Sequence, residues 1–584
     1  MGRGRIKIGP NHDNRRVSLD GFTELVLSAV PEHRCTSIIG SAKKLEALTI
    51  DGTNVTYHQL DALKTHKDTL VALELCRCIL VLDRKAALAL ASLTKLQSLT
   101  VDEVVIDGAA GDVSSNDFTK LTSLLSLKDR SDELLALLPL ATLTEYHCRN
   151  LLGSTLELLK PARNLEVLVA ERYEVDDQRF AILARFQQLR RLELRNNPNL
   201  LRPPKQSLAE LKELGSLETL LVGELPVDFD ELATTLSELT MLTTLTISFM
   251  EVTESGLAVL GQSKSLQKVR LDNCTSLTAN GLVELCRALT IHDLDIESCT
   301  GLSSDAIRGL GRGGHLTRLV IPVQLADEPR ASDADKANTW SDRLLSCIAA
   351  NSFLKTVTVP RNTTASGLRA IYKHKGVETL DLRRAEAMTL GDLRFLSGLP
   401  VLQCIMLSED QAPAGVAEVL SQCVRMEHLR LEWHDSIIDG MLDLLDGLPE
   451  IGLRSLHISM KNAGGKQLAR AIARLKSVET LVVQSDTGCS VDMISHLSRL
   501  PRLTKLGVDV KSEHDSLEVV NALGSLKTLS ELDLGAYSLT DEALTNLTNS
   551  LDLSSLHFSM VDVSESAMIR ICRERGNLEL TGSR

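Results

Sequence analysis

The sequence predicts an α/β solenoid in which a curved, parallel inner sheet carries helices on its convex side. Two observations predict this architecture: a six-residue leucine pattern recurs along the whole chain, and helix-forming segments separate its copies. Of the 584 residues, 108 are leucine. A fixed period of about 25 residues is typical of stacked repeats, each of which buries its apolar face only against its neighbours. We therefore expect about 21 repeats in one continuous solenoid, rather than several globular domains.

The repeated pattern is LxxLxL, in which other aliphatic residues also occupy the leucine positions. It reads LEALTI from Leu45, LTTLTI from Leu242 and VETLVV from Val478, and degenerate copies start at Leu121 and Leu143. The alternation predicts a short strand whose leucines point inward. The second, fourth and sixth residues after each motif start should point to the open, concave face. The rest of each period is long enough for the crossover that parallel strands require.

The segments between the strands contain signals for helix starts. In VTESGLAVL, Thr253 stands where an N-cap accepts a hydrogen bond from the first turn, and Glu254 follows where the helix dipole favours an acid. The same signal recurs at Thr278 and Thr540. The small residue Gly256 is expected to let its helix lie close to the strand layer.

Residues 242–312 and 529–547 resemble the cysteine-containing type of leucine-rich repeat, which is related to the ribonuclease-inhibitor type. In that family the eighth position after the motif start holds Asn or Cys, which bonds the backbone where the strand turns away. F-box substrate receptors, adenylate-cyclase-regulatory proteins and axonemal subunits contain such repeats; this chain has no F-box. The resemblance therefore implies protein recognition without choosing the partner. It also implies a ladder formed by Cys78, Asn197, Cys274, Cys299 and Asn362.

Three segments depart from the regular period. Residues 1–16 carry five basic residues and one acidic residue, which predicts a solvated arm or an electrostatic anchor to RNA, anionic lipid or an acidic protein surface. Residues 17–44 are expected to form an N-terminal cap or a degenerate first repeat, and residues 45–584 a single solenoid. Within it, residues 323–343 predict a polar loop insertion that contains Trp340, either a passive surface loop or a binding element.

Composition excludes several classes of function. The net charge of −13 and the aromatic content of 3% disfavour general nucleic-acid binding, although the basic arm could touch RNA. No apolar run reaches the roughly 18 residues of a membrane-spanning helix, and the first residues lack the apolar core of a secretory signal. Scattered cysteines suit a reducing compartment. We expect a cytoplasmic protein, and a flagellar, cytoskeletal or organellar complex stays open.

No motif for catalysis is present. Cys76 and Cys78 are the only close cysteine pair, which is a weak zinc signal. Residues 464–466 read GGK, but Gln467 follows where a phosphate loop needs Ser or Thr to bind magnesium. Neither GxSxG nor HExxH occurs. We therefore expect no enzymatic activity, no small-molecule substrate, no cofactor and no metal.

Charged residues of the concave face are the candidate contacts with a protein partner. Strands about 4.8 Å apart would place Lys268 beside Asp293. They would likewise place Arg270 beside Asp295, so ion pairs between neighbouring strands are the alternative to a partner footprint. Trp340 is a further candidate. The charged candidates are Arg191, Glu193, Arg195, Lys268, Arg270, Asp272, Asp293, Asp295 and Glu297.

Taken together, the sequence predicts a non-enzymatic scaffold or adaptor that binds one or more proteins as a subunit of a larger complex. A regulator of a GTPase or of adenylate cyclase is one alternative, because related repeats act on such enzymes. A structural subunit of an RNA–protein assembly is the other alternative, and only the basic N-terminal arm supports it.

Overall fold

The structure of the chain is a computed structural model, which divides into two compact units. The first comprises Met1–Cys274 and Ser564–Asn577, and the second comprises Thr275–Val563 and Leu578–Arg584. The described residues are 4–8, 22–107, 113–131, 133–173, 181–196, 209–224, 227–299, 310, 315–321, 334–351, 353–359, 361–385, 387–434, 439–448, 452–461, 465–510, 515–559, 563, 564, 567, 570, 571, 574, 575 and 578–581.

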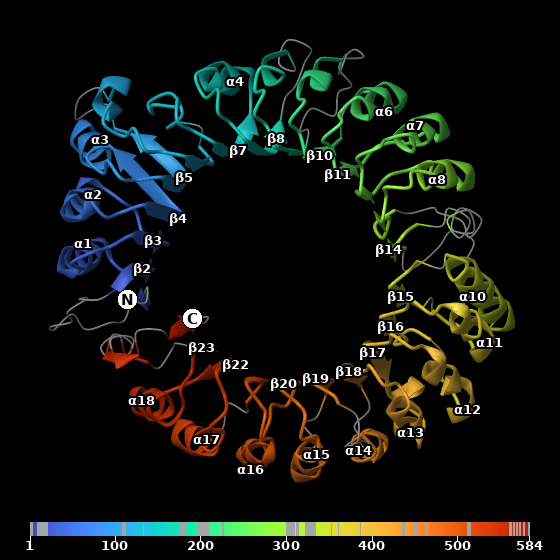
Figure 1. Ribbon diagram of the computed structural model, residues 1–584. Coiled ribbons are helices and arrows are strands. Elements are labelled where there is room, and N and C mark those ends of the chain that lie inside the picture. The colour runs from blue at the N-terminus through green and yellow to red at the C-terminus, as the bar shows by residue number, and fades with distance from the viewer. Residues whose placement is uncertain are drawn as a thin grey trace. The chain divides into compact units, whose positions relative to one another are not determined.

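In the first unit, strands that follow one another in the sequence pair in parallel, from β1 with β2 to β11 with β12. The helices all lie on one face of this sheet and leave the other face open (Figure 1). The strands are β1 (Gly4–Ile8), β2 (Phe22–Ser28), β3 (Ala47–Asp51), β4 (Ala72–Leu82), β5 (Ser98–Ile106), β6 (Ser126–Asp129), β7 (Glu145–Leu151), β8 (Val167–Tyr173), β9 (Arg191–Asn196), β10 (Thr219–Gly223), β11 (Thr244–Ser248) and β12 (Lys268–Asp272). The helices are α1 (Glu32–Ser41), α2 (Tyr57–Leu63), α3 (Arg84–Ala91), α4 (Gly153–Leu159), α6 (Phe229–Ser237) and α7 (Glu254–Leu260).

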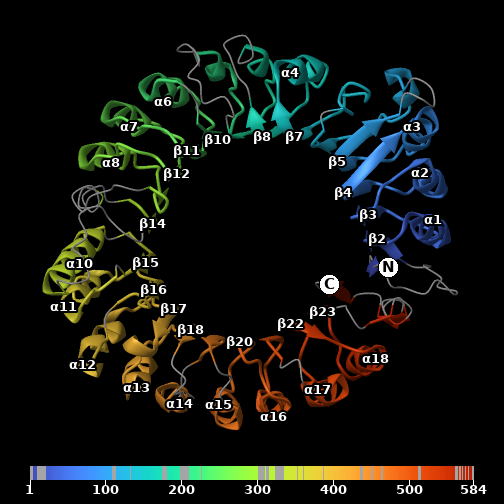
Figure 2. The same cartoon turned by 180° about the vertical axis from the view of Figure 1, so that it is seen from behind.

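The second unit repeats this plan, and from behind its helices again lie on one side of the strands (Figure 2). Its strands are β13 (Asp293–Asp295), β14 (Arg318–Val320), β15 (Thr356–Thr358), β16 (Thr379–Asp381), β17 (Cys404–Ser408), β18 (His428–Trp433), β19 (Ser455–Met460), β20 (Thr480–Ser485), β21 (Lys505–Val508), β22 (Glu531–Ser538), β23 (Ser555–Ser559) and β24 (Glu579–Thr581). Its helices are α8 (Ala279–Leu285), α10 (Ala334–Ile348), α11 (Ala365–Leu368), α12 (Leu390–Leu393), α13 (Val416–Ser421), α14 (Asp439–Asp446), α15 (Gly465–Ile472), α16 (Val491–His496), α17 (Ser516–Leu523) and α18 (Asp541–Ser550).

The predicted α/β solenoid is therefore confirmed, and 20 of its 21 predicted motifs fall on strands between β3 and β23, the exception being the motif at Leu121. The register explains the core. In the pair β11–β12, Leu245 lies opposite Val269 and Ile247 lies opposite Leu271, and all four side chains are buried. Because side chains alternate across a strand, the residues between them line the open face.

The predicted helix starts are also confirmed. Thr253 is the N-cap of α7 and accepts a hydrogen bond from the N–H of Gly256 (3.0 Å), and Thr278 and Thr540 cap α8 and α18 in the same way. The small residue after the cap has a different role from the expected one. A Cβ at Gly256 would lie 2.4 Å from Cδ1 of Phe229 in the preceding helix α6, so the glycine permits close helix–helix packing.

One motif was assigned to the wrong leucine. The pattern was expected to start at Leu121, but β6 begins at Ser126 and pairs Leu127 with Leu99 of β5, so the motif starts at Leu124. Leu121 is also buried, and its N–H donates to the carbonyl of Phe118 in the turn before the strand. Two buried leucines three residues apart made both frames plausible from sequence.

The inward position at the end of β6 holds Asp129 in place of an aliphatic residue. Its side chain is fully buried. Oδ1 accepts hydrogen bonds from the N–H (3.0 Å) and hydroxyl (2.7 Å) of Ser131, and Oδ2 accepts one from the N–H of Leu134 (3.0 Å). The carboxylate thus organises the turn that follows the strand in this repeat.

The three segments that depart from the regular period differ in part from what the sequence predicts for them. Of the predicted basic arm, Gly4–Ile8 form β1, which pairs with β2, and Ile8 is buried. Residues 17–44 contain β2 and α1. Of the predicted loop 323–343, residues 334–343 are the first part of helix α10. The sequence did not reveal this helix, because polar residues at its start mask an amphipathic pattern that continues to Ile348. Residues 323–333 lie outside the described chain.

Lysines tie three repeats to their successors. Each lysine stands in the turn before a strand, and its Nζ donates to the carbonyl of the last residue of a helix or 3₁₀ turn 23 residues ahead. A cation at this end of a helix offsets its free carbonyls. The pairs are Lys375–Gly398 (2.9 Å), Lys476–Arg499 (2.8 Å) and Lys527–Ser550 (3.0 Å).

Every cysteine that the structure describes is a free thiol. Among the described helices, none combines the length and apolar character needed to cross a bilayer. In the same part of the chain, no three His, Cys, Asp or Glu side chains are grouped so that they could hold a metal ion.

We predict that Gly256→Ala destabilises the chain. The added methyl must displace the Phe229 ring, so the free energy of unfolding should fall by about 1–3 kcal/mol in urea titrations. Gly40→Ala in α1 is the matched control, because nothing lies within 4 Å of a Cβ there. That variant should gain up to about 1 kcal/mol, since alanine is the better helix former. Equal stability of the two variants would contradict the packing argument.

We also predict that Asp129→Ala destabilises its repeat strongly. Three donors lose a buried charged acceptor, and hydrogen bonds of that kind contribute about 1.5–3 kcal/mol each before relaxation. Amide hydrogen exchange should accelerate over residues 126–148 more than over residues 244–272. If the substitution changes the exchange rates of both segments equally, Asp129 does not organise this repeat.

Candidate functional site

The candidate site is the open face of the sheet. Because the strands pair in register, the residues two and four positions after successive motif starts line up in rows across the strands. Each row takes one side chain from each strand that it crosses. Over β10 to β12 the two rows are Thr219, Thr244 and Lys268, and Leu221, Thr246 and Arg270.

Three of the predicted residues form an ion-pair cluster within β9. Arg191 donates to Oε1 of Glu193 through Nε (2.7 Å) and also through Nη2, and Arg195 donates to Oε2 through Nη2 (2.8 Å). The Glu193 side chain is only 5% exposed. Residues two apart on a strand share a face and lie within reach of a guanidinium, so pairing runs along this strand.

The two arginines change the acidity of Glu193. Burial alone would raise its pKa, but the hydrogen bonds from Arg195 and Arg191 outweigh burial and hold the pKa below its usual value. Glu193 is therefore a structural carboxylate. Its two arginines, each about half exposed, are already engaged when a partner approaches.

The predicted cations of β12, Lys268 and Arg270, have different neighbours from the arginines of β9. Lys268 and Arg270 are exposed, and neither side chain has an ion-pair partner among the described residues of the first unit. The neighbouring row positions on β11 hold Thr244 and Thr246, which are uncharged. Asp272 is half-buried, and its Oδ1 accepts a hydrogen bond from Nδ2 of Asn273 (3.3 Å). Within the described part of the first unit, no acid therefore neutralises Lys268 or Arg270.

The predicted acids lie in the second unit. Asp293 pairs with Arg318 of β14 (2.8 Å), Oδ1 of Asp295 accepts the N–H of Glu297 (3.2 Å), and Glu297 is exposed. The expected contacts of Asp293 and Asp295 with the cations of β12 would join the two units, and they stay predictions. Trp340 lies in α10, and its side chain is outside the described part of the chain.

The ladder implied by the resemblance is present at two of the cysteines. Sγ of Cys78 donates to the carbonyl of Ile50 (3.2 Å), and Sγ of Cys274 donates to that of Ile247 (3.4 Å). Each bond joins a repeat to the strand of the repeat before it. Cys299 is buried.

The two asparagines add nothing to the observed ladder. Asn197 lies outside the described residues. Asn362 has a φ of 59°, and its N–H donates to the carbonyl of Arg384. Among the described residues, the Asn362 side chain has no hydrogen-bond partner.

Sequence reasoning missed a chain of ion pairs along the edge of the open face in the first unit. Arg77 donates through Nε to Asp51 (2.7 Å) and through its N–H to Asp102 (2.5 Å). Arg130 donates to Glu171 (2.7 Å) and lies 3.6 Å from Asp102. Acids and arginines six or seven residues after the motif starts were the available signal, although the repeat from Leu143 lies between those of Arg130 and Glu171. The acids and arginines of these ion pairs neutralise one another.

A second missed cluster spans β16 to β18. Arg383 makes a two-pronged contact with Asp381 (Nε–Oδ1 2.9 Å, Nη2–Oδ2 2.8 Å) and also bonds Oε1 of Glu432 through Nη1. Arg430 lies 3.5 Å from the same Glu432 oxygen. The hydrogen bonds that Arg383 donates to Asp381 raise the pKa of Arg383, against the effect of burial. This arginine is neutralised internally.

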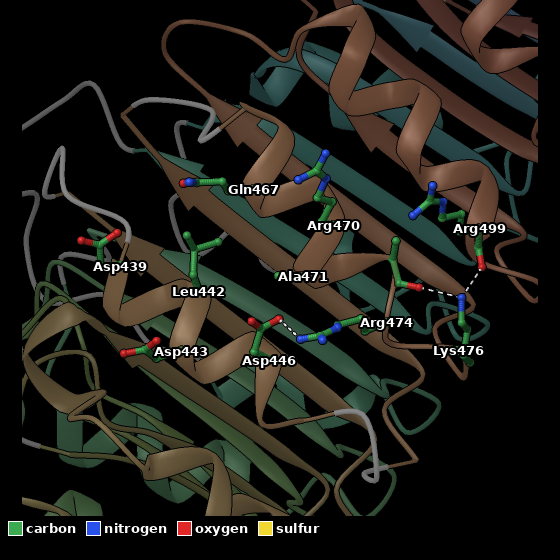
Figure 3. Close-up of a pocket in the computed structure, with 11 residues that line it drawn as sticks. Asp439, Leu442, Asp443, Asp446, Gln467, Arg470, Ala471, Arg474, Lys476 and Arg499 are labelled. Atoms are coloured by element: carbon green, nitrogen blue, oxygen red, sulfur yellow. Dashed lines mark hydrogen bonds and ion pairs between the residues drawn. The ribbon is translucent and has the colours of Figure 1, made fainter.

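The helical side of the second unit carries a groove of about 690 Å³ between α14 and α15 (Figure 3). One wall is acidic and the other is basic. Asp446 and Arg474 pair across it (2.8 Å), and Nζ of Lys476 bonds two backbone carbonyls at its end. Because the charges of the two walls offset each other, the groove favours neither sign of ligand. Its charged lining residues are Asp439, Asp443, Asp446, Arg470, Arg474, Lys476 and Arg499.

The GGK segment has a structural contact. Nζ of Lys466 pairs with Asp492 of the next helix, α16 (2.8 Å). This pair bridges adjacent repeats on the helical side.

The fold and this face define a leucine-rich-repeat solenoid with an open, charged sheet surface. No protein-family model matches the chain, and no curated protein matches it. Among solved structures, it is similar to an internalin (inlF) from Listeria monocytogenes, with 14% identity over 63% of this chain and 88% of that chain and a TM-score of 0.33.

Two further solved structures are similar over nearly the whole chain. One is the leucine-rich-repeat ectodomain of the plant membrane receptor kinase GASSHO1/SCHENGEN3 from Arabidopsis thaliana in complex with Casparian strip integrity factor 2 (15% identity, 97% of this chain, 76% of that chain, TM-score 0.35). The other is TLR13 in its complex with ssRNA13 (15% identity, 96% of this chain, 91% of that chain, TM-score 0.47).

We predict that Glu193→Gln lowers the free energy of unfolding at neutral pH by about 1–2 kcal/mol, after allowance for the solvent around both arginines. The pKa of Glu193 is lowered by folding, so its contribution is present above the unfolded pKa of about 4.3 and is lost as the pH falls through the folded value. Wild type should therefore lose more stability than the variant between about pH 5 and 3.

Urea unfolding at several pH values measures this difference. Glu297→Gln is the control, because that glutamate is exposed. If the stability curves of wild type and Glu193→Gln run parallel through the acid range, the ion-pair cluster does not stabilise the fold.

Proposed function

We propose that this chain is a non-enzymatic protein-interaction scaffold or adaptor, and that the open face over β9 to β12 binds an acidic surface of a protein partner. The observation that carries the proposal is the pair of exposed cations on β12. Lys268 and Arg270 lack ion-pair partners among the described residues of the first unit, whereas Arg191 and Arg195 already hold Glu193. Unpaired cations are the groups that gain most from an approaching carboxylate.

The surroundings of the two cations support a protein ligand. Thr219, Thr244 and Thr246 lie in the same rows and offer hydroxyl groups next to the cations. The strands β10 and β11 are bonded to neighbours on both edges, so the surface is held in place before it binds. Binding to such a preorganised surface has a small ordering cost.

The charge of the patch also favours an acidic partner. The chain carries a net charge of −13, so a local group of cations stands out against its surroundings. Such a patch steers an acidic surface toward itself and orients the encounter, and salt weakens this effect.

We place the scaffold in a larger cytoplasmic complex. Buried thiols support a reducing compartment: burial raises the pKa of both Cys35 and Cys489 to about 12, so they stay protonated and unreactive. The bonds from Cys78 and Cys274 to the preceding strands support the cysteine-containing type of repeat.

The test compares the proteins that wild type and variants capture from a cell extract. Lys268→Glu combined with Arg270→Glu should reduce the captured amount of the partner at least tenfold, because both attractive charges become repulsive. The melting temperature should be unchanged, because both side chains point away from the leucine core. Raising the salt should weaken capture by wild type more than any residual capture by the variant.

Lys264→Glu is the matched control, because this exposed lysine stands in the turn before β12 and outside the rows. It should leave the captured set unchanged. A captured set that is the same for wild type and the double variant would refute the placement of the site on β12.

A further inference from the structure

A pocket lies in the second unit at the carboxyl ends of β15, β16 and β17, where the chain leaves the sheet. Figure 1 labels these three strands. Its volume is about 740 Å³, within the range of about 300–1,000 Å³ that is typical of small-molecule sites. The residues of this pocket belong to the second unit, whereas the face over β9 to β12 belongs to the first unit. Its lining consists of Arg361, Asn362, Arg383, Arg384, Ala385, Ala387 and Asp410.

The loops that form the pocket are fixed by hydrogen bonds to their own backbone carbonyls. These bonds leave the side chains of the same residues free to face a ligand, so the pocket is organised in advance. The bonds are Ser341 Oγ to Arg361 O (2.6 Å), Asn362 N to Arg384 O (3.2 Å), Gln411 Nε2 to Ala385 O (2.6 Å) and Met388 N to Asp410 O (3.0 Å).

The pocket contains more free donors than acceptors. Arg361 and Arg384 are exposed, and among the described residues neither guanidinium has a partner. The same holds for the side-chain amide of Asn362. Arg383 differs, because Asp381 and Glu432 already neutralise it. The unpaired charges of the lining are therefore two cations and the carboxylate of Asp410.

We propose that this pocket binds the phosphate group of a phosphate monoester. Two guanidiniums match the charge of the dianion, and their planar forks match its oxygens with paired hydrogen bonds. The amide of Asn362 supplies a further donor. The pocket is much larger than a phosphate ion, so the phosphate belongs to a larger molecule, either a phosphorylated side chain of a protein or a free phosphorylated metabolite.

Asp410 lets the proposal predict the direction in which affinity changes when one lining charge is removed. Asp410 is part of the same lining, and a carboxylate there would repel a phosphate, so a neutral replacement should strengthen binding. A pocket that binds cations, or one with only a structural role, would not show this effect. Small residues complete the lining: Ala385 and Ala387 leave the space that the rest of the ligand would occupy.

The test uses calorimetric titration of the full chain at constant ionic strength. The probes are inorganic phosphate, glycerol 3-phosphate and an acetylated Ala-phosphoserine-Ala peptide, with chloride as the reference anion. Arg361→Gln combined with Arg384→Gln should weaken binding of each probe at least tenfold, since two charge-assisted contacts are lost. Asp410→Asn should tighten binding about two- to fivefold.

Arg425→Gln is the matched control, because this exposed arginine lies outside the pocket; it should change affinity by less than about twofold. Tighter binding of the peptide would support a phosphoprotein source, and equal or tighter binding of glycerol 3-phosphate would support a metabolite. The proposal is overturned if no probe binds wild type, if the double variant binds as tightly, or if Asp410→Asn weakens binding. All variants change exposed side chains, and their melting curves confirm folding. The β12 variants test the proposed function separately.

Discussion

The parallel register between each strand and the next is the constraint on which the rest of this structure depends. Within each unit a strand finds its backbone partners only on the strands before and after it. Two aliphatic side chains per strand must then meet their counterparts in the core, as Leu245 and Ile247 do with Val269 and Leu271. This is why stability in such a chain is a sum of nearest-neighbour contacts. It is also why the open face is arranged in rows.

Because register fixes the rows, the chain controls its surface chemistry mainly by what stands beside each charge. Arg191 and Arg195 share a carboxylate on their own strand, and Arg383 is held by two acids. Lys268 and Arg270 stand beside threonines instead. Charges of the same kind in equivalent positions therefore differ in purpose: some fix the surface, and others remain for a ligand. A count of surface charges would not separate them.

The sequence was sufficient for the repeat, the strand positions and the helix caps, because these follow from spacing and from local hydrogen bonds. The motif at Leu121 failed because Leu121 and Leu124 are both buried, and only the pairing of Leu127 with Leu99 chooses between the two frames. The start of α10 was hidden by its polar residues.

The contacts of the charged side chains were less predictable. Long arginines reach along a strand as easily as across strands, so pairing within β9 could not be read from row positions alone. The pocket depends on turns after three different strands and on the left-handed backbone of Asn362, and periodicity carries no information on either feature.

The lysine contacts at Lys375, Lys476 and Lys527 bear on how such a chain changes in length over evolution. Each joins a turn to a helix end 23 residues ahead, nearly one full period away. A duplication or deletion of a whole period leaves every lysine with an equivalent carbonyl, whereas a change of half a period breaks the contact and the register together. Tandem copying in units of one repeat is therefore the tolerated route. It would move a surface feature by whole strands while leaving its local surroundings intact.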